Sequence, residues 1–366
     1  MQRSKLEQFV KTSASDLGFD LAGIAPAGPF REHEYFPRWI ADGRHGEMRY
    51  LESRAENQQL KRASLASVAP WARSVIVCAV NYNSRAPYST ACPDPSRAWI
   101  SRYAWGRADY HDVLLPRLRE LEARLKERVS IAGSEAPRTW CYVDTGPLIE
   151  RVFAEHAGIG WIGKNTCVIN QQVGSWLFLG VILTSLPLTP DLPAPDRCGS
   201  CTRCLDACPT NAFPAAYQLD ASRCISYLTI EKRGDIPEDL RDGIGRHIFG
   251  CDICQDVCPW NRKAPVSPLP QFAPRTELVN PSLDRISGMN VEEFREVFRR
   301  SPVKRTRHSG LLRNAAVAMG NSGNARFIPA LLGLATGDDP VVAGHARWAL
   351  RKLGAAEPDR KETGTP

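Results

Sequence analysis

Hydrophobic positions in the first half of the chain follow both helical and strand periods. Apolar residues recur every three or four positions in Ser4–Leu17 and in Asp112–Arg128, which predicts two amphipathic helices. Short apolar runs bounded by polar residues predict strands, because β-branched and aromatic side chains favour extended backbone. These runs are Ser74–Tyr82, Trp140–Val143, Cys167–Asn170 and Trp176–Leu183. The first 190 residues are therefore predicted to form a mixed α/β unit.

Proline-rich segments divide the rest of the chain. Residues 186–195 contain four prolines, and residues 264–281 are again rich in proline; regular structure does not continue through such segments. In the helical tail, residues 313–320 resemble residues 345–354, at a separation near the period of stacked helical hairpins. So short a repeat is unstable alone and must pack on the main body.

We therefore predict an α+β chain of four parts. They are a mixed α/β catalytic unit over 1–190, a two-cluster, ferredoxin-like module over 191–265, a linker and helical segment over 266–305, and an α-helical, HEAT-like repeat over 306–366. The second part is called a two-cluster, ferredoxin-like module because of the spacing of its cysteines.

Eight of the twelve cysteines fall within 61 residues, whereas a disulfide framework spreads its cysteines over the body that it staples. A first run, C-x2-C-x2-C-x3-C-P, begins at Cys198 and matches the bacterial iron–sulfur pattern. A second run, C-x2-C-x3-C-P, begins at Cys251, and Cys224 between the runs supplies its missing ligand. Paired zinc ribbons are the alternative, but they space their cysteine pairs further apart and lack the Cys-Pro ending.

The spacing also predicts how the eight thiolates are shared. In two-cluster ferredoxins the last cysteine of a run ligates the other cluster. One 4Fe–4S cluster is then held by Cys198, Cys201, Cys204 and Cys258, and the second by Cys208, Cys224, Cys251 and Cys254. Two such clusters transfer single electrons over short distances, so the first unit must contain the site that uses these electrons.

Composition and charge limit the remaining possibilities. The chain has 366 residues, of which 43% are hydrophobic and 24% charged, as in ordinary globular proteins. A net charge of +7 permits an anionic partner without requiring one. No apolar run reaches the roughly 18 residues of a membrane span, and the N-terminus does not resemble a secretory signal. We expect a cytoplasmic, monomeric protein that has no contact with a membrane.

Three segments of the first unit carry candidate chemistry. Asp144 follows a predicted strand and precedes a helix expected from Pro147 to His156, so it is either the N-cap of that helix or a proton donor in a pocket. The glycines of 158–163 match GxGxxG, but a helix precedes them and a strand follows, the reverse of a dinucleotide site. They form a plain turn or allow close approach to another ligand. Residues 102–111 form a binding loop or a surface turn.

At this point the motifs show a family resemblance that covers nearly the whole chain. The segments SRYAWGRADYH, WCYVDTGPLIER, GIGWIGKNTCVIN, CGSCTRCLDACPT, RCISYLT and GCDICQDVCPWN resemble those of epoxyqueuosine reductases. The family more often reads GRDYH where this chain has an additional Ala108. The resemblance implies an enzyme that uses cobalamin and two 4Fe–4S clusters to reduce epoxyqueuosine to queuosine at the wobble position of tRNA anticodons. It also implies an external low-potential electron donor and kinship with reductive dehalogenases.

The resemblance further implies roles for individual residues of the first two parts. Asp144 is expected to give a proton to the oxygen of the opened epoxide. The expected cobalamin contacts are Arg62, Tyr103, Asp144, Asn165, Ser175 and Ser226. The chain contains no DxHxxG motif, which is consistent with a corrin that takes no lower histidine ligand from the protein.

A basic segment near the C-terminus supports tRNA as the partner. Six positive charges and no acidic residue lie within fifteen residues, namely Arg299, Arg300, Lys304, Arg305, Arg307 and Arg313. The alternative is a solvated basic face without a partner. Two other functions stay open: a corrinoid enzyme resembling reductive dehalogenases that acts on a small molecule, and a carrier or tRNA-binding module without chemistry. The first unit is larger than a simple electron carrier requires, which disfavours a carrier without chemistry.

Overall fold

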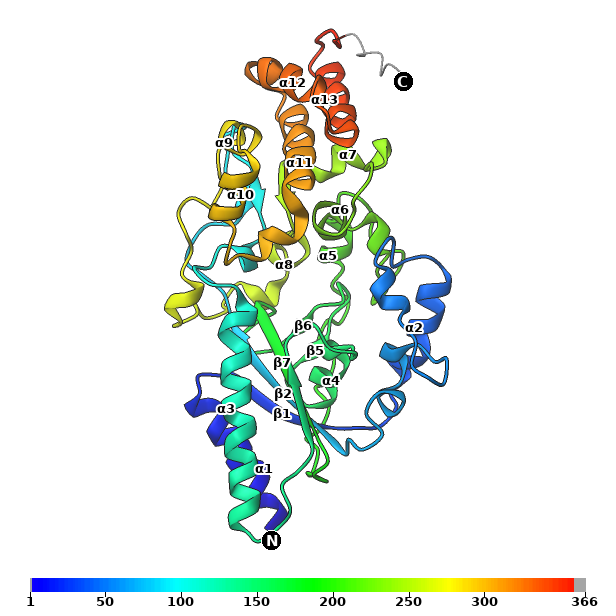
Figure 1. Ribbon diagram of the computed structural model, residues 1–366, viewed down its shortest axis with the longest axis vertical. Coiled ribbons are helices and arrows are strands. Elements are labelled where there is room, and N and C mark those ends of the chain that lie inside the picture. The colour runs from blue at the N-terminus through cyan, green and yellow to red at the C-terminus, as the bar shows by residue number, and fades with distance from the viewer. Residues whose placement is uncertain (1, 359–366) are drawn as a thin grey trace.

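The computed structural model describes residues 2–358, and its centre is a four-stranded antiparallel sheet with strand order β1-β2-β7-β4 (Figure 1). The strands are β1 (Leu21–Pro26), β2 (Ser74–Asn81), β7 (Leu177–Thr184) and β4 (Thr139–Tyr142). β2 is buried along its whole length and pairs with β7 from Ser74↔Thr184 to Asn81↔Leu177. This continuous burial explains why the apolar run was readable as a strand.

Helices cover both faces of this sheet. Helices α1 (Gln2–Asp16) and α3 (Tyr110–Ile131) lie together on one face, where the leucines of α3 pack on Ile76, Val80 and Ile182 (Figure 1). Helix α4 (Glu150–His156) packs on the other face through Phe153. Side chains alternate between the two faces of a strand, so each face of β2 contributes to a separate core. The mixed α/β character predicted for this part of the chain is confirmed.

Three short elements complete this part of the chain. Helix α2 (Arg31–Ala41) precedes a series of short turns, and a two-stranded hairpin joins β5 (Trp161–Ile162) to β6 (Val168–Ile169). The sequence did not predict β1, because LAGIAP contains Gly and Pro, which are depleted in strands. The helix expected from Pro147 begins three residues later, at Glu150.

The cysteine-rich module and the C-terminal helices share one core. The module contains α5 (Arg203–Asp206), α6 (Ile225–Ile230), α7 (Glu238–Ile244), β8 (His247–Phe249) and α8 (Ile253–Asp256). The helices that follow are α9 (Leu283–Ser287), α10 (Val291–Val297), α11 (Arg307–Asn321), α12 (Ile328–Ala335) and α13 (Pro340–Lys352). Leu228 of α6, Phe249 of β8 and Ala316 of α11 belong to the same core. The tail therefore does not stand apart from the module.

The packing also crosses the expected boundaries. Strand β3 (Trp99–Ile100) lies in the first predicted part, yet it pairs in parallel with β8 and its Ile100 is buried in the core of the module. The four-part layout and the HEAT-like character of the tail stay predictions. No helix among residues 2–358 is long and apolar enough to cross a membrane.

Candidate active site and cluster ligands

The first group of cysteines surrounds a cavity of about 350 Å³. Its walls include the four thiols that the spacing assigned to one cluster, Cys198, Cys201, Cys204 and Cys258. Burial, followed by the charge of Cys198 and Cys258, raises the pKa of Cys204 to about 11. The seven cysteines of the two runs and Cys224 between them are all free thiols. Converging thiolates repel one another unless cations lie between them, so this donor set fits an iron–sulfur cluster.

The second group lies beside the first. Burial raises the pKa of Cys251, and the charges of Cys224 and Cys208 raise it further. Hydrogen bonding with Cys167 raises the pKa of Cys254, which burial and the charges of Cys251 and Cys224 also raise. These four ligands were expected together from the spacing. Cys167 is a ninth thiol at this position, and the sequence offered no signal for it.

The glycine-rich segment 158–163 contains β5, the first strand of the β5–β6 hairpin. A Cβ on Gly160 would lie 2.4 Å from the carbonyl oxygen of Ile169, so only glycine permits this close backbone approach. Lys164 then donates from Nζ to the carbonyl oxygens of Gly199 (2.7 Å) and Cys201 (3.0 Å). The glycines thus allow close packing of the hairpin, their expected approach to another ligand stays a prediction, and Lys164 after them holds the first cysteine run in place.

Asp144 lies in the loop between β4 and α4, in the left-handed backbone region at φ 58°. The N-cap alternative is wrong, because α4 is preceded by Ile149 at the cap position. The Asp144 side chain is 68% exposed, so it is not enclosed in the pocket that we expected. Tyr110 donates its hydroxyl to Oδ2 of Asp144 (2.9 Å), and Nε2 of His111 lies 4.0 Å from the same oxygen. The carboxylate is thus held from one side and open on the other.

A chain of polar contacts fixes the histidine beside Asp144. Asp109, which caps the N-terminus of α3, lies 2.7 Å from Nδ1 of His111. Lys304 forms an ion pair with the other oxygen of Asp109 at 3.2 Å. Tyr110 and His111, at the start of α3, come from the segment 102–111, which therefore supplies two of the neighbours of Asp144. Its Arg102 is an exception, since this guanidinium is buried and bonds to Asn83 and Ser84.

Aromatic side chains connect Asp144 with the second group of cysteines. Tyr110 stacks on Phe178 with 4.4 Å between ring centroids, and Tyr103 packs edge-on against Tyr110. Tyr103 also contacts Phe249, two residues before Cys251. Burial, with the nearby charge of Asp144, raises the pKa of both tyrosines, so their hydroxyls stay protonated donors at neutral pH. Tyr103 thus lies between the cluster ligands and Asp144.

Buried polar groups lie at the base of the Asp144 loop. Arg62 donates to the carbonyl oxygen of Leu148 (2.7 Å). Oε1 of Glu150 and the hydroxyl of Tyr142 are buried without a hydrogen-bond partner among residues 2–358. Burial raises the pKa of Glu150 to about 7; Asp144 raises it as well, and Arg62 opposes the shift. The sequence did not single out Glu150 or Tyr142, because their burial depends on tertiary packing.

The structure does not gather all of the expected cobalamin contacts around Asp144. Asn165 lines the cavity of the first cysteine group and donates to the carbonyl oxygen of Cys254 (3.3 Å). Ser175 is buried and accepts hydrogen bonds from Gln255 (3.0 Å) and Asn261 (2.8 Å). In this structure both side chains hold protein segments together, and their expected contacts with cobalamin stay a prediction.

Ser226 lies beside a cluster ligand. Burial raises the pKa of Cys224, and hydrogen bonds from Ser226 oppose that shift. Of the residues expected at cobalamin, Arg62 and Tyr103 therefore lie near Asp144, whereas Ser226 lies at the second cysteine group.

The basic residues of the C-terminal segment divide into two kinds. Arg299, Arg300 and Arg307 are exposed, and the exposed Arg305 forms a bidentate ion pair with Glu231 at 2.9 and 3.0 Å. Arg313 is fully buried and donates to the carbonyl oxygens of Leu228, Lys232 and Gly234. Its expected role in binding tRNA is wrong, because all of its donors face the protein interior.

Arg305 lies close to the Asp144 site. Its guanidinium sits over the ring of Tyr50, 5.7 Å from the centroid. The charge of Asp144 contributes to the raised pKa of Arg305, after the stronger hydrogen bond to Glu231. Tyr50, which is 47% exposed, thus stands with Arg305 at the edge of the site. An exposed aromatic ring and a cation beside an open carboxylate are suited to a large anionic substrate.

Fold and site together define an iron–sulfur oxidoreductase with an acid-bearing site. A family model described as 4Fe-4S double cluster binding domain matches residues 197–261, and one described as Epoxyqueuosine reductase QueG, DUF1730 matches residues 62–145. The epoxyqueuosine reductase of Pseudomonas aeruginosa is 41% identical over 360 residues, covering 96% of this chain and 95% of the relative. That of Xanthomonas campestris pv. campestris is 38% identical over 348 residues, covering 94% and 95%. The chain belongs to the epoxyqueuosine reductase family.

Solved structures agree with this assignment. An epoxyqueuosine reductase crystallised with an epoxyqueuosine-modified tRNA stem loop has a TM-score of 0.84 at 35% identity, covering 96% of this chain and 91% of that chain. The Bacillus subtilis enzyme, in a structure with its catalytic aspartate loop swung out of the active site, has a TM-score of 0.83 at 34% identity and the same coverage.

Proposed function

We propose that this chain reduces epoxyqueuosine to queuosine at the wobble position of tRNA anticodons. Relatives that carry this name match over nearly all of the chain, and a related structure contains an epoxyqueuosine-modified tRNA stem loop. The observation that carries the proposal is the combination of two four-cysteine groups with an open, tyrosine-bonded Asp144. This combination favours the family's reaction over that of an electron carrier, which needs no acid.

The reaction needs two electrons and two protons, because removal of the epoxide oxygen leaves an alkene and water. Bound cobalamin supplies a cobalt that stores reducing power at one atom, and the 4Fe–4S clusters supply the electrons singly. Oε1 of Glu150 and the hydroxyl of Tyr142 are buried without a partner, and buried polar groups need hydrogen-bond partners. Together with Arg62 and Tyr103, they fit the amide-rich edge of a corrin. We assign cofactor contacts to this side of the site.

Asp144 donates a proton to the oxygen of the opened epoxide, which is a poor leaving group unless it is protonated. Tyr110 holds Oδ2 of Asp144, which orients the other oxygen toward the open side. His111 lies within reach to return a proton and is itself held by Asp109 and Lys304. These residues position the acid and hold its proton source.

The tRNA binds along the exposed basic residues of the C-terminal segment. Arg299, Arg300, Lys304, Arg305 and Arg307 contact phosphates, which makes the affinity fall with salt. The modified base is flipped out of the anticodon loop to reach Asp144. Tyr50, beside Arg305, offers an aromatic face for stacking on a nucleotide. The protein acts as a monomer in the cytoplasm with an external low-potential electron donor.

The proposal is tested in cells that lack epoxyqueuosine reductase and accumulate the epoxide in tRNA. Expression of the wild-type chain is expected to restore queuosine, measured by mass analysis of tRNA nucleosides. Asp144→Asn and Cys254→Ser, expressed to the same level, are expected to leave the epoxide in place. Persistence of the epoxide with the wild-type chain, or full conversion by either variant, contradicts the proposal.

A further inference from the structure

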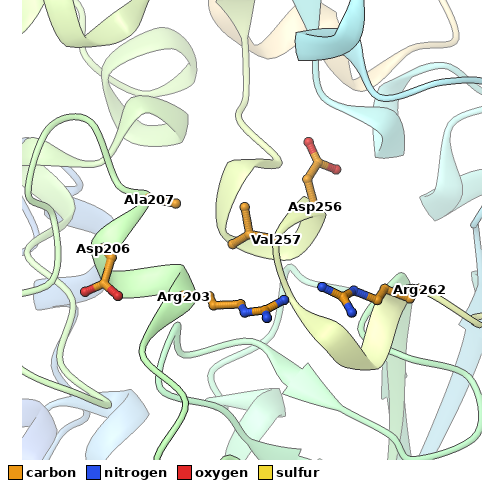
Figure 2. Close-up of a pocket in the computed structure, with 6 residues that line it drawn as sticks. All are labelled: Arg203, Asp206, Ala207, Asp256, Val257 and Arg262. Atoms are coloured by element: carbon orange, nitrogen blue, oxygen red, sulfur yellow. The ribbon is translucent and has the colours of Figure 1, made fainter.

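A surface depression of about 480 Å³ lies between helices α5 and α8, outside the Asp144 site. Its walls are Arg203, Asp206, Ala207, Asp256, Val257 and Arg262 (Figure 2). Ala207 directly precedes Cys208, and Val257 directly precedes Cys258. Arg203 also lines the cavity of the first cysteine group. The depression therefore opens to solvent next to ligands of both clusters.

Two unpaired guanidinium groups dominate this depression. Figure 2 shows Arg203 and Arg262 pointing toward one another, while the carboxylates of Asp206 and Asp256 point away from them. Asp206 accepts a hydrogen bond from Thr202 (2.8 Å), and Oδ1 of Asp256 is buried. Within residues 2–358 neither guanidinium forms an ion pair or a side-chain hydrogen bond, although Asp206 and Asp256 line the same depression. Arginines whose guanidinium groups have no partner within the protein are suited to external carboxylates.

The position of the depression within the electron path gives it a role. Tyr103 and Phe249 connect the second cysteine group to Asp144, so that group lies on the substrate side. The first cysteine group borders the depression through Arg203. Electron tunnelling weakens steeply with distance, so electrons enter best where a donor can approach the first group. Arg305, which we proposed to bind tRNA, lies at the other site, close to Asp144.

We propose that the depression between α5 and α8 is the docking site for an acidic, low-potential electron-transfer protein, whose surface carboxylates bind Arg203 and Arg262. The proposal rests on the proposed function, because only a reductase needs repeated delivery of electrons. Each encounter oxidises one reduced carrier by one electron. Two encounters supply the two electrons that one epoxide consumes, and the two protons come from Asp144 and solvent.

The test uses the holoenzyme and two reductants of opposite charge. A reduced plant-type 2Fe–2S ferredoxin is the acidic protein probe, and reduced methyl viologen is a small cationic probe. Arg262→Glu reverses a charge outside the cysteine runs, Arg262→Lys retains it, and Arg119→Glu on the exposed face of α3 is the matched control. The readouts are the stopped-flow rate of visible bleaching of the iron–sulfur clusters and the affinity for oxidised ferredoxin by calorimetry.

We expect Arg262→Glu to slow reduction by ferredoxin at least about tenfold at low salt, because charge complementarity steers association. For Arg262→Glu we also expect the rate of reduction by ferredoxin to depend less on salt. Arg262→Lys is expected to restore most of this rate, and Arg119→Glu is expected to match wild type. Reduction of Arg262→Glu by viologen is expected to match that of wild type. Equal ferredoxin rates in wild type and Arg262→Glu, or no reduction of wild type by ferredoxin, overturn the proposal. Slower reduction of Arg262→Glu by viologen also overturns the proposal, because it indicates damaged clusters. Weaker binding of tRNA by Arg262→Glu overturns it as well. If wild type reduced by viologen forms no queuosine, the proposed function is refuted. The rate at which ferredoxin bleaches the clusters still tests the docking site in that case.

Discussion

Replacing Glu150 with Gln is expected to stabilise the protein at alkaline pH. Oε1 of Glu150 is buried without a partner, and burial raises the pKa of this carboxyl to about 7. In the unfolded chain the pKa returns to its ordinary value of 4.5. The wild type therefore has its full stability below pH 4.5 and loses part of it as the pH rises through 7, since ionisation is easier in the unfolded state. Glutamine cannot ionise and removes this loss.

The difference between the two pKa values sets the size of the effect. A separation of 7 − 4.5 corresponds to an upper value of about 3.4 kcal/mol, at 1.36 kcal/mol per pKa unit. The stability that the wild type loses through ionisation of Glu150 is about 3 kcal/mol at pH 8 and under about 1 kcal/mol at pH 5. At roughly 2.1 cal/mol/K per residue, unfolding of 366 residues has an entropy near 0.77 kcal/mol/K. The expected gain in Tm is thus about 4 °C at pH 8.

The assay compares the Tm values of wild type, Glu150→Gln and the exposed control Glu127→Gln between pH 5 and pH 8, all without cobalamin and with equal iron content. We expect the gap between Glu150→Gln and wild type to widen with pH and that of the control to stay constant. If the Tm difference between Glu150→Gln and wild type is the same at both pH values, Glu150 has the same pKa in the folded protein as in the unfolded chain. That result refutes the argument that an unpartnered buried carboxyl lies beneath the Asp144 loop.

Three further predictions concern the acid, the buried arginine and the basic face. Asp144→Asn is expected to retain iron and cobalt but to lose turnover by at least about a hundredfold, the usual contribution of general acid catalysis; wild-type nucleoside yields exclude the role. Arg313→Met leaves the carbonyl groups of Leu228, Lys232 and Gly234 without this donor and is expected to cost about 3–5 kcal/mol, seen as a lower Tm and faster proteolysis of the tail; an unchanged Tm contradicts this. Arg305→Glu combined with Arg307→Glu is expected to weaken tRNA binding and to reduce its salt slope, whereas cluster reduction by dithionite is unaffected; an identical slope rejects this surface.

The grouping of the cysteines was predictable because metal-ligand spacing is a local property of the sequence. The first run places three thiols within seven residues, from Cys198 to Cys204, and the structure brings Cys258 to the same cavity. Strands β2 and β7 were readable for a similar reason, since long apolar runs leave few alternatives.

Side-chain orientation was less predictable, because it depends on tertiary contacts. Asn165 and Ser175 lie in segments that resemble the family, yet their polar atoms bond to protein groups. Arg313 belonged to a run of basic residues, and charge alone does not show which member is buried. One signal was available: Ala315–Gly320 are small or apolar at every position, which indicates a helix that is buried all round. That pattern distinguishes Arg313 from the exposed Arg305.

The central claim, removal of the epoxide oxygen from tRNA, is tested most directly with anaerobic holoprotein in a single-turnover experiment. Protein with two 4Fe–4S clusters and one cobalamin is mixed with tRNA that carries epoxyqueuosine and with excess reductant. The account predicts a nucleoside lighter by one oxygen atom, formed in proportion to enzyme and absent with Asp144→Asn. An unchanged nucleoside, or purified protein whose eight cysteines form disulfides and bind no iron, contradicts it.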